Sequence, residues 1–150
     1  MNIQNQKVEN LPSSVNIFRL WVDHGQQVKN DTYGYVVYCG KDDPTTQLPF
    51  VVLQNDTLVQ AVKSLDGNLY QAVFYNANTT LNQQDVSISV SNPCIIQVEL
   101  IGNEFVASVQ DPQMNKALKQ ITVTLGKKSF VFELPQGKLA GKPVVKKLDL

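Results

Sequence analysis

Short runs in which β-branched or aromatic residues alternate with polar ones are the feature that most constrains the fold of this chain. Residues 85–91 read DVSISVS, where Val86, Ile88 and Val90 alternate with aspartate and serine. A side-chain period of two is typical of a strand that is buried on one face and solvated on the other. Similar runs recur along the chain, separated by Asn, Asp, Gly and Pro, while helical periodicity is almost absent.

About ten such strands, with turn signals roughly every eight to twelve residues, predict an all-β fold, namely an antiparallel β-sandwich with little or no helix. A barrel is the alternative architecture. Residues 111–118 are the one segment that could form a helical turn. Three connections have the composition of hairpin turns, namely residues 65–68, 101–104 and 125–129. The Pro-flanked segment 40–50 is the best internal boundary in the sequence.

Composition excludes several functional classes. Thirteen basic residues balance thirteen acidic ones, which argues against nucleic-acid binding because that depends on neutralising phosphates. No apolar run approaches the ~20 residues of a membrane span, and the first residues lack the pattern of a signal peptide. Cys39 and Cys94 follow no metal-ligand spacing, so we expect two small buried hydrophobes. No phosphate loop, metal cluster or nucleophile elbow occurs, and we expect no cofactor and no metal.

Versatile side chains crowd residues 20–40, which hold the single tryptophan, the single histidine and three of the five tyrosines. Trp21, Tyr33 and Tyr35 are the candidates for a sugar-binding platform, although the same residue types also serve cross-strand packing. His24 lies between Asp23 and Gly25 at the end of an alternating run, which favours a structural histidine in a turn. We therefore predict a hairpin over residues 15–39 whose aromatics pack, with Trp21 at least partly buried. Any self-association would involve this hairpin.

The ordered set of motifs resembles the C-terminal end of the polysaccharide lyase family that includes the hyaluronate, chondroitin and xanthan lyases. The resemblance covers roughly residues 18–114 and is carried by a Trp-x-Asp-His-Gly segment, a Tyr-x-Tyr-Val-Val strand, a strand pair around Asn55, and a strand ending in Ser-x-x-Asp-Pro. In this chain the matching residues are Trp21, Asp23, His24, Gly25, Tyr33, Tyr35, Val36, Val37, Gly40, Val52, Leu53, Asn55, Val59, Gln60, Ala61, Val62, Ser91, Pro93, Ser108, Asp111 and Pro112. We interpret Asp23, His24, Gly25, Asn55, Asp111 and Pro112 as structural motif residues.

The resemblance implies that residues 1–46 are a tail and hairpin like the last strands of the lyase central sandwich, and that residues 47–150 are the C-terminal sandwich. It also implies that the catalytic residues belong to an α/α toroid that no part of this chain matches. We therefore expect an inactive accessory domain that supports the upstream domains of a secreted or periplasmic bacterial lyase and binds acidic polysaccharide only weakly. The alternatives are a free-standing carbohydrate-binding module and, third, a small self-sufficient lyase.

Overall fold

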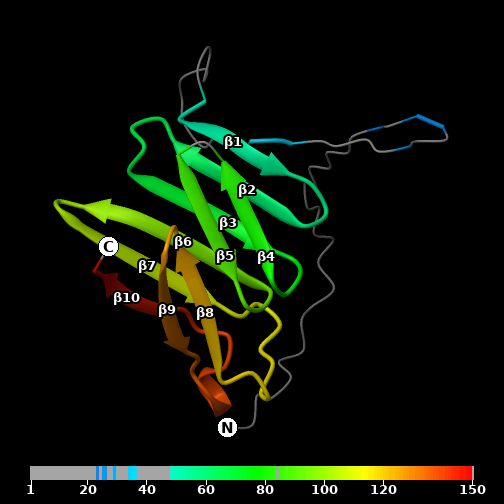
Figure 1. Ribbon diagram of the computed structural model, residues 1–150. Coiled ribbons are helices and arrows are strands. Elements are labelled where there is room, and N and C mark those ends of the chain that lie inside the picture. Colours follow the sequence, from blue (N-terminus) through cyan, green and yellow to red (C-terminus); the bar gives the residue numbers. More distant parts are fainter. Residues whose placement is uncertain are drawn as a thin grey trace, which may run out of the picture. The chain divides into compact units, whose positions relative to one another are not determined.

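The computed structural model describes residues 23, 25, 26, 29, 34–36, 48–83 and 85–149 (Figure 1). The chain divides into two units, residues 1–35 and residues 36–150, and the fold described below is that of the second. Of the strand expected over residues 15–23, Asp23 is described and has no regular secondary structure, and the other residues lie outside the described ones. In the strand expected over residues 33–40, the described residues Gly34, Tyr35 and Val36 have no regular secondary structure.

Two antiparallel sheets form the second unit, as the alternating pattern predicts (Figure 1). The larger sheet has six strands in the order β1-β2-β3-β6-β7-β10, and the smaller has four in the order β4-β5-β8-β9. The strands are β1 (Phe50–Asn55), β2 (Val59–Ser64), β3 (Leu69–Phe74), β4 (Thr79–Gln83), β5 (Val86–Val90), β6 (Cys94–Ile101), β7 (Glu104–Gln110), β8 (Gln120–Leu125), β9 (Lys128–Glu133) and β10 (Val144–Leu148).

The three predicted hairpins are confirmed, since they connect β2 to β3, β6 to β7 and β8 to β9. The first turns on Gly67, whose φ of 75° suits glycine. Strand β4 is not apparent from the sequence, because Leu81 is the one buried residue in its five positions. Residues 111–118 form turns rather than a helical turn, and the one helical element in the described part of the chain is the 3₁₀ turn η1 (Gly137–Leu139).

The core lies between the inner faces of the two sheets. Phe74 and Ile96 of the larger sheet and Leu81, Ile88 and Phe132 of the smaller are almost completely buried. Burying one side chain of this size contributes about 1.5–3 kcal/mol. In β5, Ile88 and Val90 are buried while Ser87 and Ser89 are partly exposed, as the DVSISVS pattern predicts.

The larger sheet extends beyond the smaller at its β1 end. Strand β4 contacts β2 and strand β9 contacts β10, so the smaller sheet spans β2 to β10. Val51 of β1 lies opposite Lys63 on the inward-facing row, yet it is 45% exposed. A β-bulge between Val52 and Gln54 interrupts the pairing of β1 with β2.

Candidate functional site: the outer faces of the two sheets

The predicted sugar-binding residues are described only in part. Tyr35 is 67% exposed, whereas Trp21, Tyr33 and His24 lie outside the described residues. The Asp23 carboxylate accepts a hydrogen bond from the Gly25 backbone N–H at 2.8 Å, and Gly25 has a φ of 75°. This geometry is that of a tight turn. Carbohydrate binding by the three aromatics remains a prediction.

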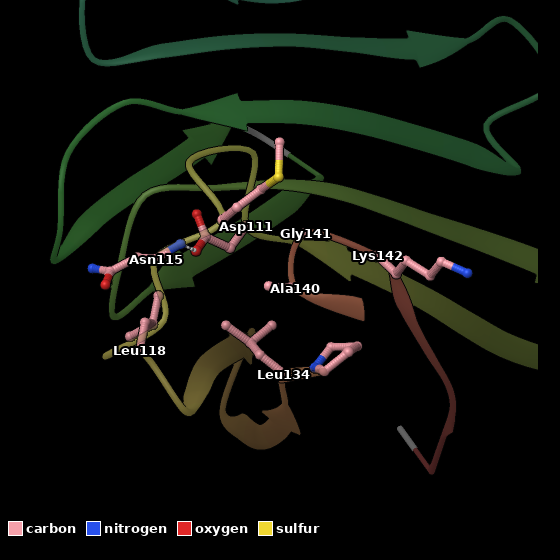
Figure 2. Close-up of a pocket in the computed structure, with 9 residues that line it drawn as sticks. Asp111, Asn115, Leu118, Leu134, Ala140, Gly141 and Lys142 are labelled. Carbon is pink, nitrogen blue, oxygen red and sulfur yellow. Dashed lines mark hydrogen bonds between the residues drawn. The ribbon is translucent and has the colours of Figure 1, made fainter. Parts of the chain in front are cut away.

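Asp111 organises the loop that joins β7 of the larger sheet to β8 of the smaller (Figure 2). It is 4% exposed, and its carboxylate accepts from the backbone N–H groups of Gln113 at 2.9 Å and Asn115 at 2.7 Å. These bonds satisfy the local backbone without a helix, which explains the turns over residues 111–118. The hollow beside Asp111 has no room for a water molecule. Asp111 therefore holds a loop, and Pro112 beside it is exposed.

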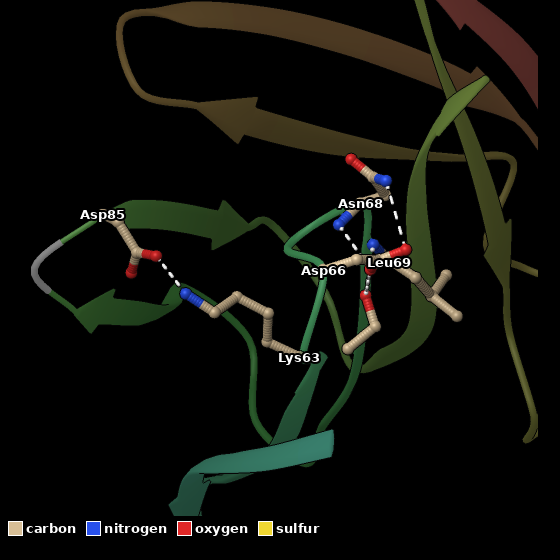
Figure 3. Close-up of polar contacts among 6 residues, drawn as sticks. Lys63, Asp66, Asn68, Leu69 and Asp85 are labelled. Carbon is tan, nitrogen blue, oxygen red and sulfur yellow. Dashed lines mark hydrogen bonds and ion pairs between the residues drawn. The ribbon is translucent and has the colours of Figure 1, made fainter. Parts of the chain in front are cut away.

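The acidic residues at two hairpin turns have similar structural roles. Asp56 accepts from the backbone N–H groups of Leu58 and Val59, both at 2.8 Å, and these bonds hold the pKa of its carboxyl below the ordinary value. Asp66 accepts from the Ser64 hydroxyl and the Asn68 backbone (Figure 3), which lowers its pKa too. Beside the first turn, the Asn55 side-chain oxygen accepts from the Gln60 amide at 3.2 Å.

An ion pair links β2 of the larger sheet to the turn after β4 of the smaller sheet. Lys63 of β2 binds Asp85, which lies in the turn between β4 and β5 (Figure 3). The hydrogen bond to Asp85 raises the pKa of Lys63, and the same bond lowers the pKa of Asp85. The Lys63 ammonium also lies 5.8 Å from the centre of the Tyr70 ring. Both charges are thus engaged in joining strands.

The described residues contain no group of three or more His, Cys, Asp or Glu that could hold a metal ion. Cys94 is a free, completely buried thiol, as predicted, whereas Cys39 lies outside the described residues. Burial raises the pKa of Cys94 to about 12. Because the thiolate is the reactive form of cysteine, Cys94 acts as a small hydrophobe.

Hydroxyl groups form cross-strand pairs on the outer face of the smaller sheet. Thr80 and Ser89 form a cross-strand hydrogen bond of 2.8 Å, and so do Thr124 and Ser129. A shallow groove of about 310 Å³ runs over this face. It is lined by uncharged residues, namely Asn78, Thr80, Ser89, Val90, Ser91, Thr122 and Thr124. We call this the hydroxyl face. The alternating pattern of β5 predicts polar side chains on its outer face. The sequence does not predict that the other three strands of the smaller sheet place hydroxyl groups on the same face.

The outer face of the larger sheet has a different composition at its β1 end. Val52 of β1 lies opposite Val62 of β2, and Val73 of β3 lies opposite Ile95 of β6. Val62 lies opposite Gln71, and Val73 is two residues from Gln71 on the same face of β3. Val62 and Val73 are therefore diagonal neighbours, and the two pairs adjoin. Val52 is 55% exposed and Ile95 is 38% exposed. We call these four residues the apolar band. Sequence reasoning missed it, because strand order decides which residues meet on a face.

Comparison with known proteins agrees with the resemblance in the sequence. Residues 51–120 match the model of the polysaccharide lyase family 8 C-terminal beta-sandwich domain. The chain is also 28% identical over 140 residues to chondroitinase-AC of Pedobacter heparinus, a match that covers 87% of this chain and 20% of that enzyme. The chain is thus similar to the C-terminal region of polysaccharide lyase family 8 proteins.

A solved structure supports the same assignment. A chondroitinase AC lyase, studied in complexes with oligosaccharides, superposes with a TM-score of 0.54 at 25% identity over 66% of this chain and 15% of that one. The chain spans about a fifth, or less, of the length of the relatives it matches. No helix in the described residues is long and apolar enough to cross a membrane.

Proposed function

We propose that this chain is a non-catalytic accessory domain of a chondroitin- or hyaluronan-type lyase and that it supports the central and catalytic domains. The observation that carries the proposal is the match of residues 51–120 to the C-terminal β-sandwich domain of the family. In this proposal residues 1–46 continue the central sandwich and residues 47–150 form the accessory domain.

The chemistry of the described residues supports this function. Asp56, Asp66 and Asp111 bind backbone N–H groups of turns, and Asp85 binds Lys63. Elimination across a uronic acid needs a base, an acid and a group that neutralises the carboxylate. These four carboxylates are instead engaged in turns and strand contacts.

Weak contact with the polysaccharide path is a second element of the proposal. It is favoured by Tyr35, which is 67% exposed and offers an aromatic face. The balance of thirteen basic and thirteen acidic residues removes long-range attraction for an anionic chain. We therefore expect the chain to elute from a heparin column at low salt. Tight, salt-sensitive retention would favour the free-standing carbohydrate-binding module instead.

Lyase activity gives the decisive test. The chain is incubated with chondroitin and hyaluronan, and the unsaturated product is followed by ultraviolet absorbance, with Pedobacter heparinus chondroitinase-AC as the positive control. We expect no product from this chain. Product formation that is abolished in His24→Ala would contradict the accessory role and support the small self-sufficient lyase.

A further inference from the structure

We infer that the β1 end of the six-stranded sheet is the surface that binds the upstream domains of the lyase. The docking surface consists of the apolar band (Val52, Val62, Val73 and Ile95) and the outer edge of β1 at Val51 and Val52. Its partner is an uncharged protein surface of β-branched or aromatic side chains that offers an extended strand. This inference rests on the proposed accessory function and names the surface that performs it.

Two valines at opposite ends of one row of the larger sheet differ in their surroundings. Val52, Val62, Gln71, Gln97, Ser108 and Val145 lie side by side across the outer face of the larger sheet. Val145 is 61% exposed, and its neighbours on that face are Ser108, Lys147 and the half-buried Val106, so its surroundings are mixed in polarity. Val52 is 55% exposed and continues into the apolar band. A continuous apolar patch marks an interaction site, whereas single exposed hydrophobic residues are normal.

The edge strands of the two sheets also differ in their chemistry. Strand β10, at the other edge of the larger sheet, has Lys146 and Lys147, and lysines on an edge discourage pairing with another strand. On β9 of the smaller sheet, the Val131 carbonyl accepts a hydrogen bond from Lys146 at 2.6 Å. Strand β4 exposes polar side chains. Strand β1 reads FVVLQN, without a charge, and is the apolar edge among the four; among the described strands, β2 alone pairs with it.

Strand β1 lies at the start of the β-sandwich domain. The family match begins at residue 51, inside β1, and this chain spans 20% of the chondroitinase-AC length. A C-terminal domain is joined to the rest of its enzyme through its first strand. That covalent connection gives the surfaces nearest to it a high effective concentration for each other. An uncharged surface also offers nothing to attract an anionic polysaccharide, which favours a protein partner.

The test compares Val52→Lys with the matched control Val145→Lys, which places the same charge at the other end of the same row. The binding partner is Pedobacter heparinus chondroitinase-AC from which the matching fifth has been deleted. Binding is measured by analytical ultracentrifugation, and circular dichroism with thermal melting checks that both variants fold. We expect the wild type and Val145→Lys to bind alike and Val52→Lys to bind at least about tenfold more weakly, the size of effect typical of a central interface residue.

Each other result contradicts a different part of the inference. Equal binding by all three chains would overturn the docking surface and leave the accessory role intact. No binding by the wild type would overturn the accessory role together with the surface. Dimerisation of the wild type alone, lost in Val52→Lys but not in Val145→Lys, would assign the edge to a second copy of this chain and overturn the upstream partner.

Discussion

On the hydroxyl face of the smaller sheet, the side chains form cross-strand hydrogen bonds, Thr80 with Ser89 and Thr124 with Ser129. The apolar band of the larger sheet instead presents two cross-strand pairs of aliphatic side chains. The hydroxyl groups are stable in water because they bond each other and solvent. The apolar side chains gain free energy when they leave water, by about 25 cal/mol per Å² of buried area. Two sheets that share one core thus differ in what they require outside it, and the larger sheet is the one that gains from a partner.

Inner and outer residues of one strand should contribute very differently to the free energy of unfolding, and β9 offers a direct test. Phe132 is completely buried, and the preceding Val131 is 42% exposed on the other face. We expect Phe132→Ala to lower the free energy of unfolding by about 3–5 kcal/mol because it leaves a cavity. Val131→Thr should change it by less than about 0.5 kcal/mol. Urea unfolding followed by circular dichroism measures both, and similar losses would remove the distinction between the two faces.

A smaller loss in the free energy of unfolding is expected for changes in the loop that joins the two sheets. Asp111→Ala removes the carboxylate that accepts from Gln113 and Asn115, so we expect a loss of about 1–3 kcal/mol, the range for buried groups left without a partner. Asp111→Asn keeps one acceptor oxygen and should lose less. The same unfolding experiment applies. If Asp111→Ala were as stable as the wild type, the loop would not be needed to hold the two sheets in their arrangement.

The smallest change in the free energy of unfolding is expected for the Lys63–Asp85 ion pair between the sheets. The pKa of Asp85 is lowered in the fold, so its contribution is complete above the unfolded-state pKa of about 4 and is lost as the pH falls through the lowered value. The pKa of Lys63 is raised, so its contribution is complete below an unfolded-state pKa of about 10.4 and is lost as the pH rises through the raised value.

We therefore expect Asp85→Asn to be slightly less stable than the wild type at neutral pH and equally stable in strong acid. Urea midpoints across the acid range measure this difference, and Asp149→Asn, at an exposed position after β10, is the control. A deficit in Asp85→Asn that persisted unchanged in strong acid would show that the ion pair does not link the sheets in solution.

Much of the fold of the two sheets could be predicted from the sequence, because strands and turns depend on the local pattern of residues. Alternation in DVSISVS assigns Ile88 and Val90 to the core, and both are buried. Turn residues such as Gly67 mark hairpins that the structure contains. Strand β4 could not be predicted, since its sequence TTLNQ is almost entirely polar and its place in a sheet depends on pairing with β5. Asp111 was identified from its motif, but its bonds to Gln113 and Asn115 depend on the folded loop.

The sequence by itself determined the all-β class, the hairpins, the buried thiol of Cys94 and the resemblance to the lyases, because these depend on residue order and on neighbours along the chain. Only the tertiary structure decided that β3 pairs with β6 rather than with β4. That pairing places Val73 beside Ile95 in the apolar band and leaves β4 to start the hydroxyl face. The physical reason is that a surface is assembled from strands distant in the sequence, and their order is selected by burial of the shared core.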